Sequence, residues 1–116
     1  RKIENMYLQE ILKKENIILS LGGGTPVYFN NMDLVTSQSI SFYLKMTPAE
    51  LTERLLHEKE HRPLISHLKD EEVKEFISKH LFERAPYYEK ALHRINNNYK
   101  SVEDICNEII TILKFN

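Results

Sequence analysis

The most informative stretch of the chain reads Ile17-Ile-Leu-Ser-Leu-Gly-Gly-Gly-Thr-Pro26. Its first half is a short apolar run, as expected of a strand that is buried on both faces of a parallel sheet. The triple glycine follows at once, and the 116 residues contain no other glycine. Backbone without side chains can approach a ligand closely, and open α/β sheets bind ligands outside the carboxyl ends of their strands. The stretch therefore predicts either a ligand-binding turn or a plain tight turn.

The segments on both sides of this turn predict helices that alternate with strands. Strands are expected at 17–21, 40–46 and 92–95. Helices are expected at 1–14, around 32–36 after Asn30 or Asn31, at 47–57 with Thr47 as cap, from Asp70 to about 90 with a kink or new start at Pro86, and after Ser101 as cap. This order is typical of βαβ units, so the expected fold class is α/β with a parallel sheet.

Composition and charge exclude several classes of protein. Hydrophobic residues make up 41% and charged residues 28% of a chain long enough for one domain, as in ordinary globular proteins. A formal net charge of −1 and the lack of a long apolar run indicate neither a nucleic acid nor a membrane as partner. The single cysteine, Cys106, excludes an internal disulfide and suits the cytoplasm. Its helical position predicts a small buried hydrophobic residue rather than a reactive thiol.

A second motif lies in the charged loop at 58–69, which reads Glu58-Lys-Glu-His-Arg-Pro-Leu-Ile65 at its start. An arginine on a mobile loop, next to a proline and an apolar anchor, suits a lid that brings charge to a transferring phosphate. The alternative for Arg62 is an ordinary solvated charged loop. The nearby His57, His61 and His67 have a spacing that could hold zinc, but acidic and basic residues interrupt them and the lid explains the region better. We therefore expect no metal ligand here.

A third motif is Phe82-Glu-Arg-Ala-Pro-Tyr-Tyr-Glu-Lys-Ala91. Arg84 and Tyr88 stand four residues apart and share one face if the helix is continuous. The guanidinium fork of arginine matches a carboxylate with two parallel hydrogen bonds. The alternative is a surface arginine packed on a tyrosine.

Taken together, the three motifs resemble the shikimate kinase family. The resemblance rests on Gly22-Gly-Gly24 after an apolar strand, Arg62-Pro-Leu-Ile65 on a lid, Arg84-x-x-x-Tyr88 before the last strand, and Arg1-Lys-Ile-Glu4 on the helix before the glycines. It covers essentially all 116 residues in order. It implies a P-loop kinase fold, a five-stranded parallel sheet with helices on both faces, of which this chain supplies three strands and the C-terminal portion of a single domain.

The resemblance also implies a reaction and a set of substrate contacts. The family transfers a phosphoryl group from ATP, with Mg²⁺, to the 3-hydroxyl of shikimate in aromatic amino acid biosynthesis, and we expect a monomer. Arg1 and Arg84 would hold the shikimate carboxylate from two sides, and Glu4 would orient Arg1. The backbone of Gly23 would bind a substrate hydroxyl, with Gly22 and Gly24 letting the loop pass close.

On the nucleotide side, the resemblance implies three further roles. Arg62 would be the lid arginine that reaches the ATP phosphates and acts in catalysis. Arg54, on the helix before the lid, would lie against the adenine. Lys100 would lie in the adenine-side loop, where the family often has arginine.

One part of the family pattern is not found in this sequence. The phosphate-binding loop Gly-x-x-x-x-Gly-Lys-(Ser/Thr) is not among the 116 residues, because every glycine lies at 22–24. Since the chain opens at Arg1 inside an expected helix, we expect this loop and the Mg²⁺ ligands to lie upstream, and the 116 residues alone to be inactive. Two alternatives stay open: a non-catalytic kinase-like binding module, and a kinase of the same fold that acts on another small metabolite.

Overall fold

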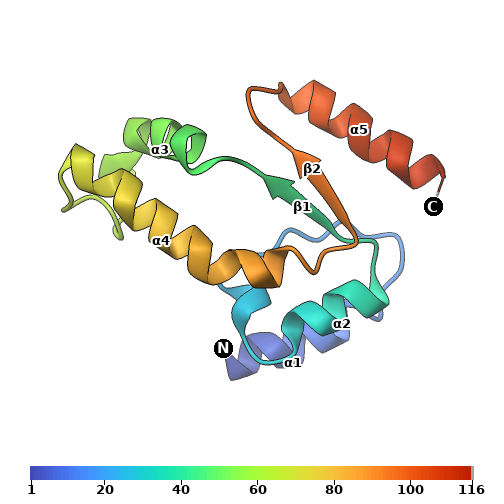
Figure 1. The fold of residues 1–116 in the computed structure, drawn as a ribbon. Helices are drawn as coiled ribbons and strands as arrows, with labels where there is room; N and C mark the ends of the chain where they lie inside the picture. Colours follow the sequence, from blue (N-terminus) through green and yellow to red (C-terminus); the bar gives the residue numbers. More distant parts are fainter. Residues whose placement is uncertain (116) are drawn as a thin grey trace. The chain divides into compact units, whose positions relative to one another are not determined.

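The computed structural model describes residues 1–115 of the 116, and its elements alternate as the sequence predicts. The helices are α1 (Lys2–Ile11), α2 (Asn31–Gln38), α3 (Pro48–His57), α4 (Asp70–Tyr88) and α5 (Val102–Lys114); the 3₁₀ turns are η1 (Thr25–Val27) and η2 (Lys59–His61); the strands are β1 (Phe42–Lys45) and β2 (His93–Asn96) (Figure 1). They form two compact units. Unit 1 comprises Arg1–Tyr43 and Glu83–Arg94, and unit 2 comprises Leu44–Phe82 and the residues from Ile95 on.

The strands β1 and β2 pair in parallel, as expected. The N–H of His93 donates to the carbonyl of Ser41 at 2.9 Å, and the N–H of Asn97 donates to the carbonyl of Lys45 at 2.7 Å. Both partners advance by the same number of residues in the same direction, which is the pattern of a parallel ladder. Ser41 adds a side-chain bond, because its hydroxyl accepts from the N–H of Leu92 at 2.8 Å.

The strand expected at 17–21 is not formed, so the prediction of three strands is wrong by one. The sheet of the described residues contains β1 and β2 only. Ile18 is fully exposed at 100%, and Ile17 and Leu19 are exposed at 46% and 39%. A strand exists only through hydrogen bonds to a neighbour, and none of residues 1–115 offers the segment a ladder partner.

Unit 1 is organised around a small apolar cluster between α1 and α2. Its buried members are Leu8, Met32, Val35 and Ala91, with Leu12, Leu21 and Tyr43 packed against them. Asn30 stands at the N-cap position of α2, as the sequence predicts, but its side chain makes no capping bond. The cluster packs α1 against α2, the two helices that lie on either side of the glycine turn in the sequence.

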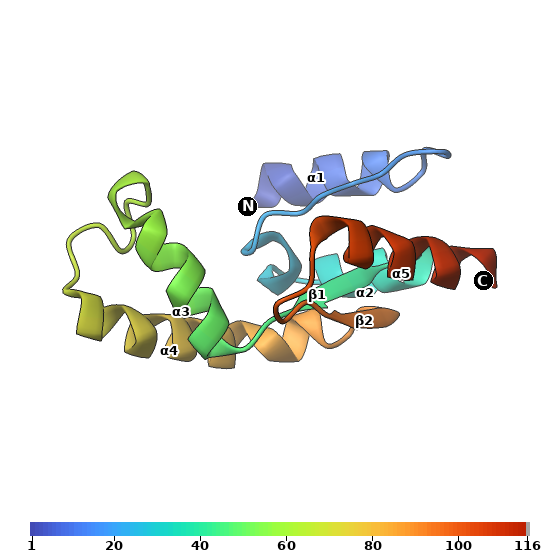
Figure 2. The ribbon, with the colours of Figure 1, turned by 90° about the horizontal axis from the view of Figure 1, so that it is seen from above.

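Unit 2 contains a second cluster, between α3 and the first half of α4, and the two helices cross at an angle in Figure 2. α3 begins where the sequence predicts: the hydroxyl of Thr47 accepts from the N–H of Glu50 at 3.2 Å, and Pro48 is the first helical residue. The centre of the cluster is formed by Ile65, Val73 and Ile77, exposed at 4%, 0% and 6%. Ile65 comes from the 58–69 loop, so this loop is attached by an apolar anchor.

Two further sequence expectations need correction. α4 continues through Pro86 as far as Tyr88, so Pro86 does not begin a new helix. Cys106 is exposed, although its helical position predicted burial. The reason is that α5, capped by Ser101 as predicted, buries only Ile105 against the described residues. A helical apolar face becomes a buried face only where another element covers it.

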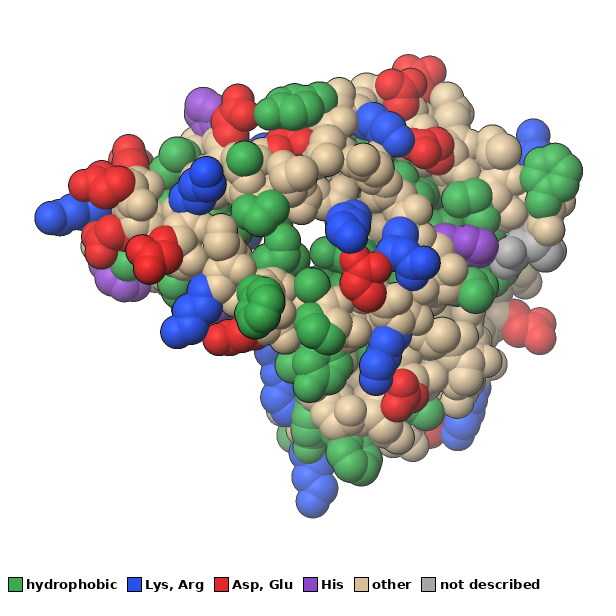
Figure 3. All heavy atoms as spheres, viewed as in Figure 1, with side chains coloured by type: hydrophobic (Ala, Val, Ile, Leu, Met, Phe, Trp, Pro, Cys, Tyr) green, Lys and Arg blue, Asp and Glu red, His purple; other side chains and the backbone are tan. Residues whose placement is uncertain are grey.

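None of the helices within residues 1–115 is long and apolar enough to span a membrane. Acidic and basic side chains are intermixed over the face of the molecule in Figure 3. This mixture agrees with the formal net charge of −1.

Candidate active site

The glycine turn at 22–24 is the centre of the candidate site in unit 1. The N–H of Thr25 donates to the carbonyl of Gly22 at 3.1 Å, which starts η1 directly after the glycines. None of the glycines has a positive φ, so the backbone conformation does not require glycine. A Cβ on Gly23 would lie 2.9 Å from Nη1 of Arg84, and a Cβ on Gly24 would collide with the guanidinium of Arg1, so a side chain at either position would displace an arginine. The structure therefore brings both predicted carboxylate-binding arginines to the glycine turn.

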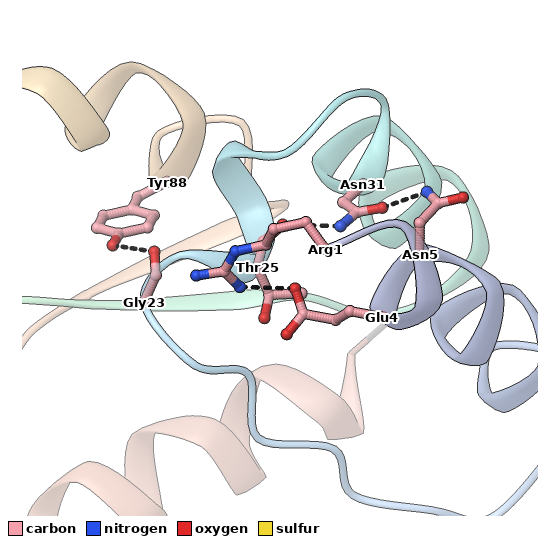
Figure 4. Close-up of polar contacts among 7 residues, drawn as sticks. All are labelled: Arg1, Glu4, Asn5, Gly23, Thr25, Asn31 and Tyr88. Carbon is pink, nitrogen blue, oxygen red and sulfur yellow. Dashed lines mark hydrogen bonds and ion pairs between the residues drawn. The ribbon is translucent and has the colours of Figure 1, made fainter.

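Arg84 reaches the turn from α4. Because α4 is continuous, Arg84 and Tyr88 share one face, and the hydroxyl of Tyr88 donates to the carbonyl of Gly23 at 2.6 Å (Figure 4). The Tyr88 ring also packs on Tyr43, with ring centroids 5.3 Å apart. These contacts fix the end of α4 against the turn.

Arg84 is also exceptional among the arginines in its charge environment. The other four are paired with carboxylates: Arg1 with Glu4, Arg54 with Glu50, Arg62 with Glu58, and Arg94 with Glu89. Within residues 1–115, Arg84 has neither an ion-pair nor a hydrogen-bond partner. A half-buried guanidinium without an anion beside a glycine turn can accept a carboxylate ligand.

Arg1 is held against the turn by a carboxylate, as the resemblance implied (Figure 4). Its Nη1 lies 2.7 Å from Oε1 of Glu4. This hydrogen bond lowers the pKa of Glu4 below its ordinary value of 4.5, and a second bond from the buried side chain of Thr25 acts in the same direction, while desolvation opposes both. Glu4 therefore links α1 to the start of η1 as a charged group at neutral pH.

A fully buried amide, which sequence reasoning did not identify as part of the site, continues this network. Nδ2 of Asn31 donates to the carbonyl of Thr25 at 2.9 Å, and its Oδ1 accepts from Nδ2 of Asn5 (Figure 4). Asn31 thus joins α1, η1 and α2 immediately after the glycines. The sequence alone indicates only a possible helix cap at Asn31. The signal that could have found it is a second asparagine just after the cap position, at the first buried site of α2.

In unit 2, two of the predicted nucleotide-side residues share one open hollow of about 440 Å³. The hollow is lined by Glu50, Glu53, Arg54, His57, Tyr99, Lys100 and Ser101. Nη2 of Arg54 lies 3.7 Å from Oε1 of Glu50, and Nζ of Lys100 lies 2.9 Å from Oε2 of Glu108. The structure therefore places Arg54 and Lys100 at one hollow, although they are far apart in the sequence.

Arg62 is not among the residues that line this hollow. Its guanidinium binds Oε2 of Glu58 through Nε at 3.1 Å and Nη2 at 2.9 Å, and its side chain is 54% exposed. Within residues 1–115, no group of three or more His, Cys, Asp or Glu side chains could hold a metal ion.

The family model for shikimate kinase matches residues 1–114. The chain therefore belongs to the shikimate kinase family. Two similar family members are the shikimate kinase of Flavobacterium johnsoniae, 44% identical over 97% of this chain and 67% of the relative, and that of Azobacteroides pseudotrichonymphae, 47% identical over 78% of this chain and 54% of the relative. The chain thus spans about half to two thirds of the length of these shikimate kinases.

A solved structure agrees with the family assignment. The crystal structure of shikimate kinase from Bacteroides thetaiotaomicron superimposes with a TM-score of 0.83 at 28% sequence identity, covering 98% of this chain and 65% of that one. The P-loop kinase fold class expected from the sequence is therefore confirmed, with two parallel strands in the described residues.

Proposed function

We propose that the protein carrying this chain is a shikimate kinase, which transfers a phosphoryl group from ATP to the 3-hydroxyl of shikimate. The observation that carries the proposal is the unpaired guanidinium of Arg84 beside Gly23, with the guanidinium of Arg1 against Gly24. Shikimate has one carboxylate and three hydroxyls, so a site for it needs one strong anion clamp and several weaker donors.

The substrate side supplies both kinds of group. Arg84 meets the carboxylate with its fork, which fixes the position and the rotation of the ring, and Arg1 approaches from a second side. The N–H groups of Gly23 and Gly24 donate no hydrogen bond within residues 1–115, so they are available to a substrate hydroxyl. Gly22 keeps the approach to them open.

The nucleotide side fits the base and the lid. The hollow next to Arg54 and Lys100 takes the adenine, with the planar guanidinium of Arg54 against the ring. Arg62, on the lid at 58–69, leaves Glu58 and moves to the phosphates. An exposed ion pair of this kind contributes only about 0–1 kcal/mol, so the exchange is easy. On the phosphates, Arg62 stabilises the charge that develops during transfer.

The phosphates and Mg²⁺ do not fit the described residues. No group of side chains within 1–115 suits a metal ion, and the 116 residues contain no Gly-x-x-x-x-Gly-Lys sequence. We therefore assign the binding of the phosphates and of Mg²⁺ to other residues of the protein. The 116 residues form the C-terminal portion of one kinase domain, and the complete enzyme works as a cytoplasmic monomer. The 116 residues alone should be inactive.

The test is shikimate-dependent release of ADP by the complete protein, expressed from its full reading frame. We expect turnover with shikimate, and binding without turnover for an analogue that lacks the 3-hydroxyl. Shikimate binding without any ADP release would instead indicate a non-catalytic binding module. Turnover with a different hydroxylated metabolite, and none with shikimate, would indicate another kinase of the same fold.

A further inference from the structure

The start of α3 has the sequence of a capping box, but its second half is exchanged with another segment. In a capping box the acidic residue returns to the N–H of the cap residue. Here the N–H of Glu50 donates to the hydroxyl of Thr47, whereas the N–H of Thr47 donates to Oδ1 of Asn98 at 3.0 Å. Oε1 of Glu50 accepts instead from the N–H of Tyr99 at 2.8 Å. Two reciprocal bonds therefore connect α3 to the turn before α5.

Burying the carboxylate of Glu50 at the start of α3 costs free energy. It is 3% exposed, and its Oε2 is buried without a hydrogen-bond partner among residues 1–115. A buried carboxylate is costly unless it is fully paired, and its pairs here are the N–H of Tyr99 and the guanidinium of Arg54 at 3.7 Å. Capping α3 does not account for this cost, because Thr47 and Asn98 satisfy the end of the helix.

The bond to Tyr99 holds an unfavourable backbone conformation. Tyr99 has a φ of 54°, in the left-handed region that bulky residues rarely adopt. Such a conformation persists where the surroundings enforce it, and such residues cluster at ligand sites. Tyr99 and its neighbour Lys100 both line the hollow described above. The conformation of Tyr99 therefore determines where Lys100 enters the hollow.

We propose that Glu50 is a positioning residue for the nucleotide. It joins the two walls of the hollow: Arg54, one turn further along α3, and Tyr99 with Lys100 on the turn. Glu50 is only 3% exposed and its Oε2 is buried, so it acts mainly by fixing the position of these neighbours. The inference rests on the proposed function only for the identity of the ligand, an adenine nucleotide, in this hollow.

The test compares Glu50→Gln with Glu75→Gln in the complete protein. Glutamine at 50 keeps an oxygen for the N–H of Tyr99 but removes the charge that holds Arg54, whereas Glu75 is exposed on α4 and does not line the hollow. We expect Glu50→Gln to raise the KM for ATP about tenfold, because the bond from Tyr99 loses its charged acceptor, and to change the KM for shikimate and kcat less than about twofold. Glu75→Gln should leave all three within about twofold.

Two results would overturn the inference: an unchanged KM for ATP in folded Glu50→Gln, or an equal loss for ATP and shikimate, which a purely structural role predicts. If Glu50→Gln does not fold, Asn98→Ala breaks the reciprocal bond, and its KM for ATP decides in the same way. If the wild-type protein releases no ADP with shikimate, the proposed function fails separately. Titration with ADP then tests Glu50, which must weaken ADP binding about tenfold when changed to Gln.

Discussion

Arg84 and Arg62, the two arginines with the largest proposed roles, are held in opposite ways. Arg84 lies half-buried on a long helix, next to a glycine turn and without an anionic partner in residues 1–115. Arg62 lies on an exposed loop and is already bound to Glu58. A preorganised cation binds its ligand at once, whereas a paired cation must first exchange its partner. The difference suits a substrate clamp in the first case and a mobile lid in the second.

The largest effect is expected when Arg84, the preorganised arginine, is replaced. Arg84→Lys keeps the charge but loses the fork, and leaving a partly buried carboxylate half-paired costs about 2–5 kcal/mol. Shikimate affinity should therefore fall roughly thirty- to several-thousand-fold, with lower turnover and little change in ATP affinity. Steady-state kinetics on the complete protein measure this. Arg94→Lys, an arginine paired with Glu89, is the matched control. Unchanged shikimate kinetics would remove Arg84 from the site.

Asn31→Ala tests the support beneath the same region. It leaves the carbonyl of Thr25 without its buried donor and removes one of the two amide oxygens that accept from Asn5, so the protein should lose about 1–3 kcal/mol of stability. Urea denaturation gives this value. Asn107→Ala is the control, because Asn107 is exposed and its side chain makes no hydrogen bond within residues 1–115, and it should change stability by about 0.5 kcal/mol or less. Equal effects of the two substitutions would contradict the network in Figure 4.

Gly24→Ala tests the closeness of Arg1 to the turn. The added methyl group displaces the flexible guanidinium, so the KM for shikimate should rise about fivefold to tenfold, equivalent to about 1 kcal/mol. The control is the same substitution in an Arg1→Ala background, where the guanidinium that the methyl group would displace is absent and Gly24→Ala should add little further loss. If Gly24→Ala raises the KM for shikimate as much without Arg1 as with it, Arg1 is not the reason for the glycine at 24.

Glu58→Gln tests how strongly the ion pair with Glu58 holds Arg62 on the lid. It releases Arg62 from an exposed ion pair worth at most about 1 kcal/mol, so kcat should change less than about fivefold, and upward if partner exchange limits turnover. Rapid-quench measurement of phosphoryl transfer is the assay. A loss greater than tenfold would mean that Glu58 itself acts on the nucleotide.

The smallest expected effect is the loss of the Arg1–Glu4 contact at acidic pH. Because the pKa of Glu4 is lowered in the folded protein, the Arg1–Glu4 contact contributes fully above its ordinary pKa of 4.5 and is lost as the pH falls through the lowered value. An NMR titration of the Glu4 carboxyl should give a midpoint below 4.5, and Arg1→Gln should move the midpoint upward. A wild-type midpoint above 4.5 would contradict the contact.

Local signals were the most reliable part of the sequence. Thr47-Pro48 and Ser101 predicted the starts of α3 and α5 because a cap acts within its own helical turn. The strand at 17–21 and the burial of Cys106 failed because each depends on a neighbour that a local pattern does not contain.

The site was predictable to the extent that family motifs carried it. The resemblance paired Arg84 with the glycine turn, a contact between residues more than sixty positions apart that no periodicity reveals. The buried amide of Asn31 and the exchanged capping box at Glu50 escaped prediction. Their partners lie on other elements, and asparagine or glutamate at a helix start has an ordinary local explanation.

The unpaired run Ile17-Ile-Leu-Ser-Leu21 has a practical consequence for anyone who prepares this chain. It forms no regular secondary structure, carries no charge and no proline, and exposes Ile18 completely. Exposed segments of this composition pair with copies of themselves and seed aggregation. The 116 residues produced alone should therefore self-associate at high concentration. An added peptide that pairs with residues 17–21 as a neighbouring strand should keep them in solution.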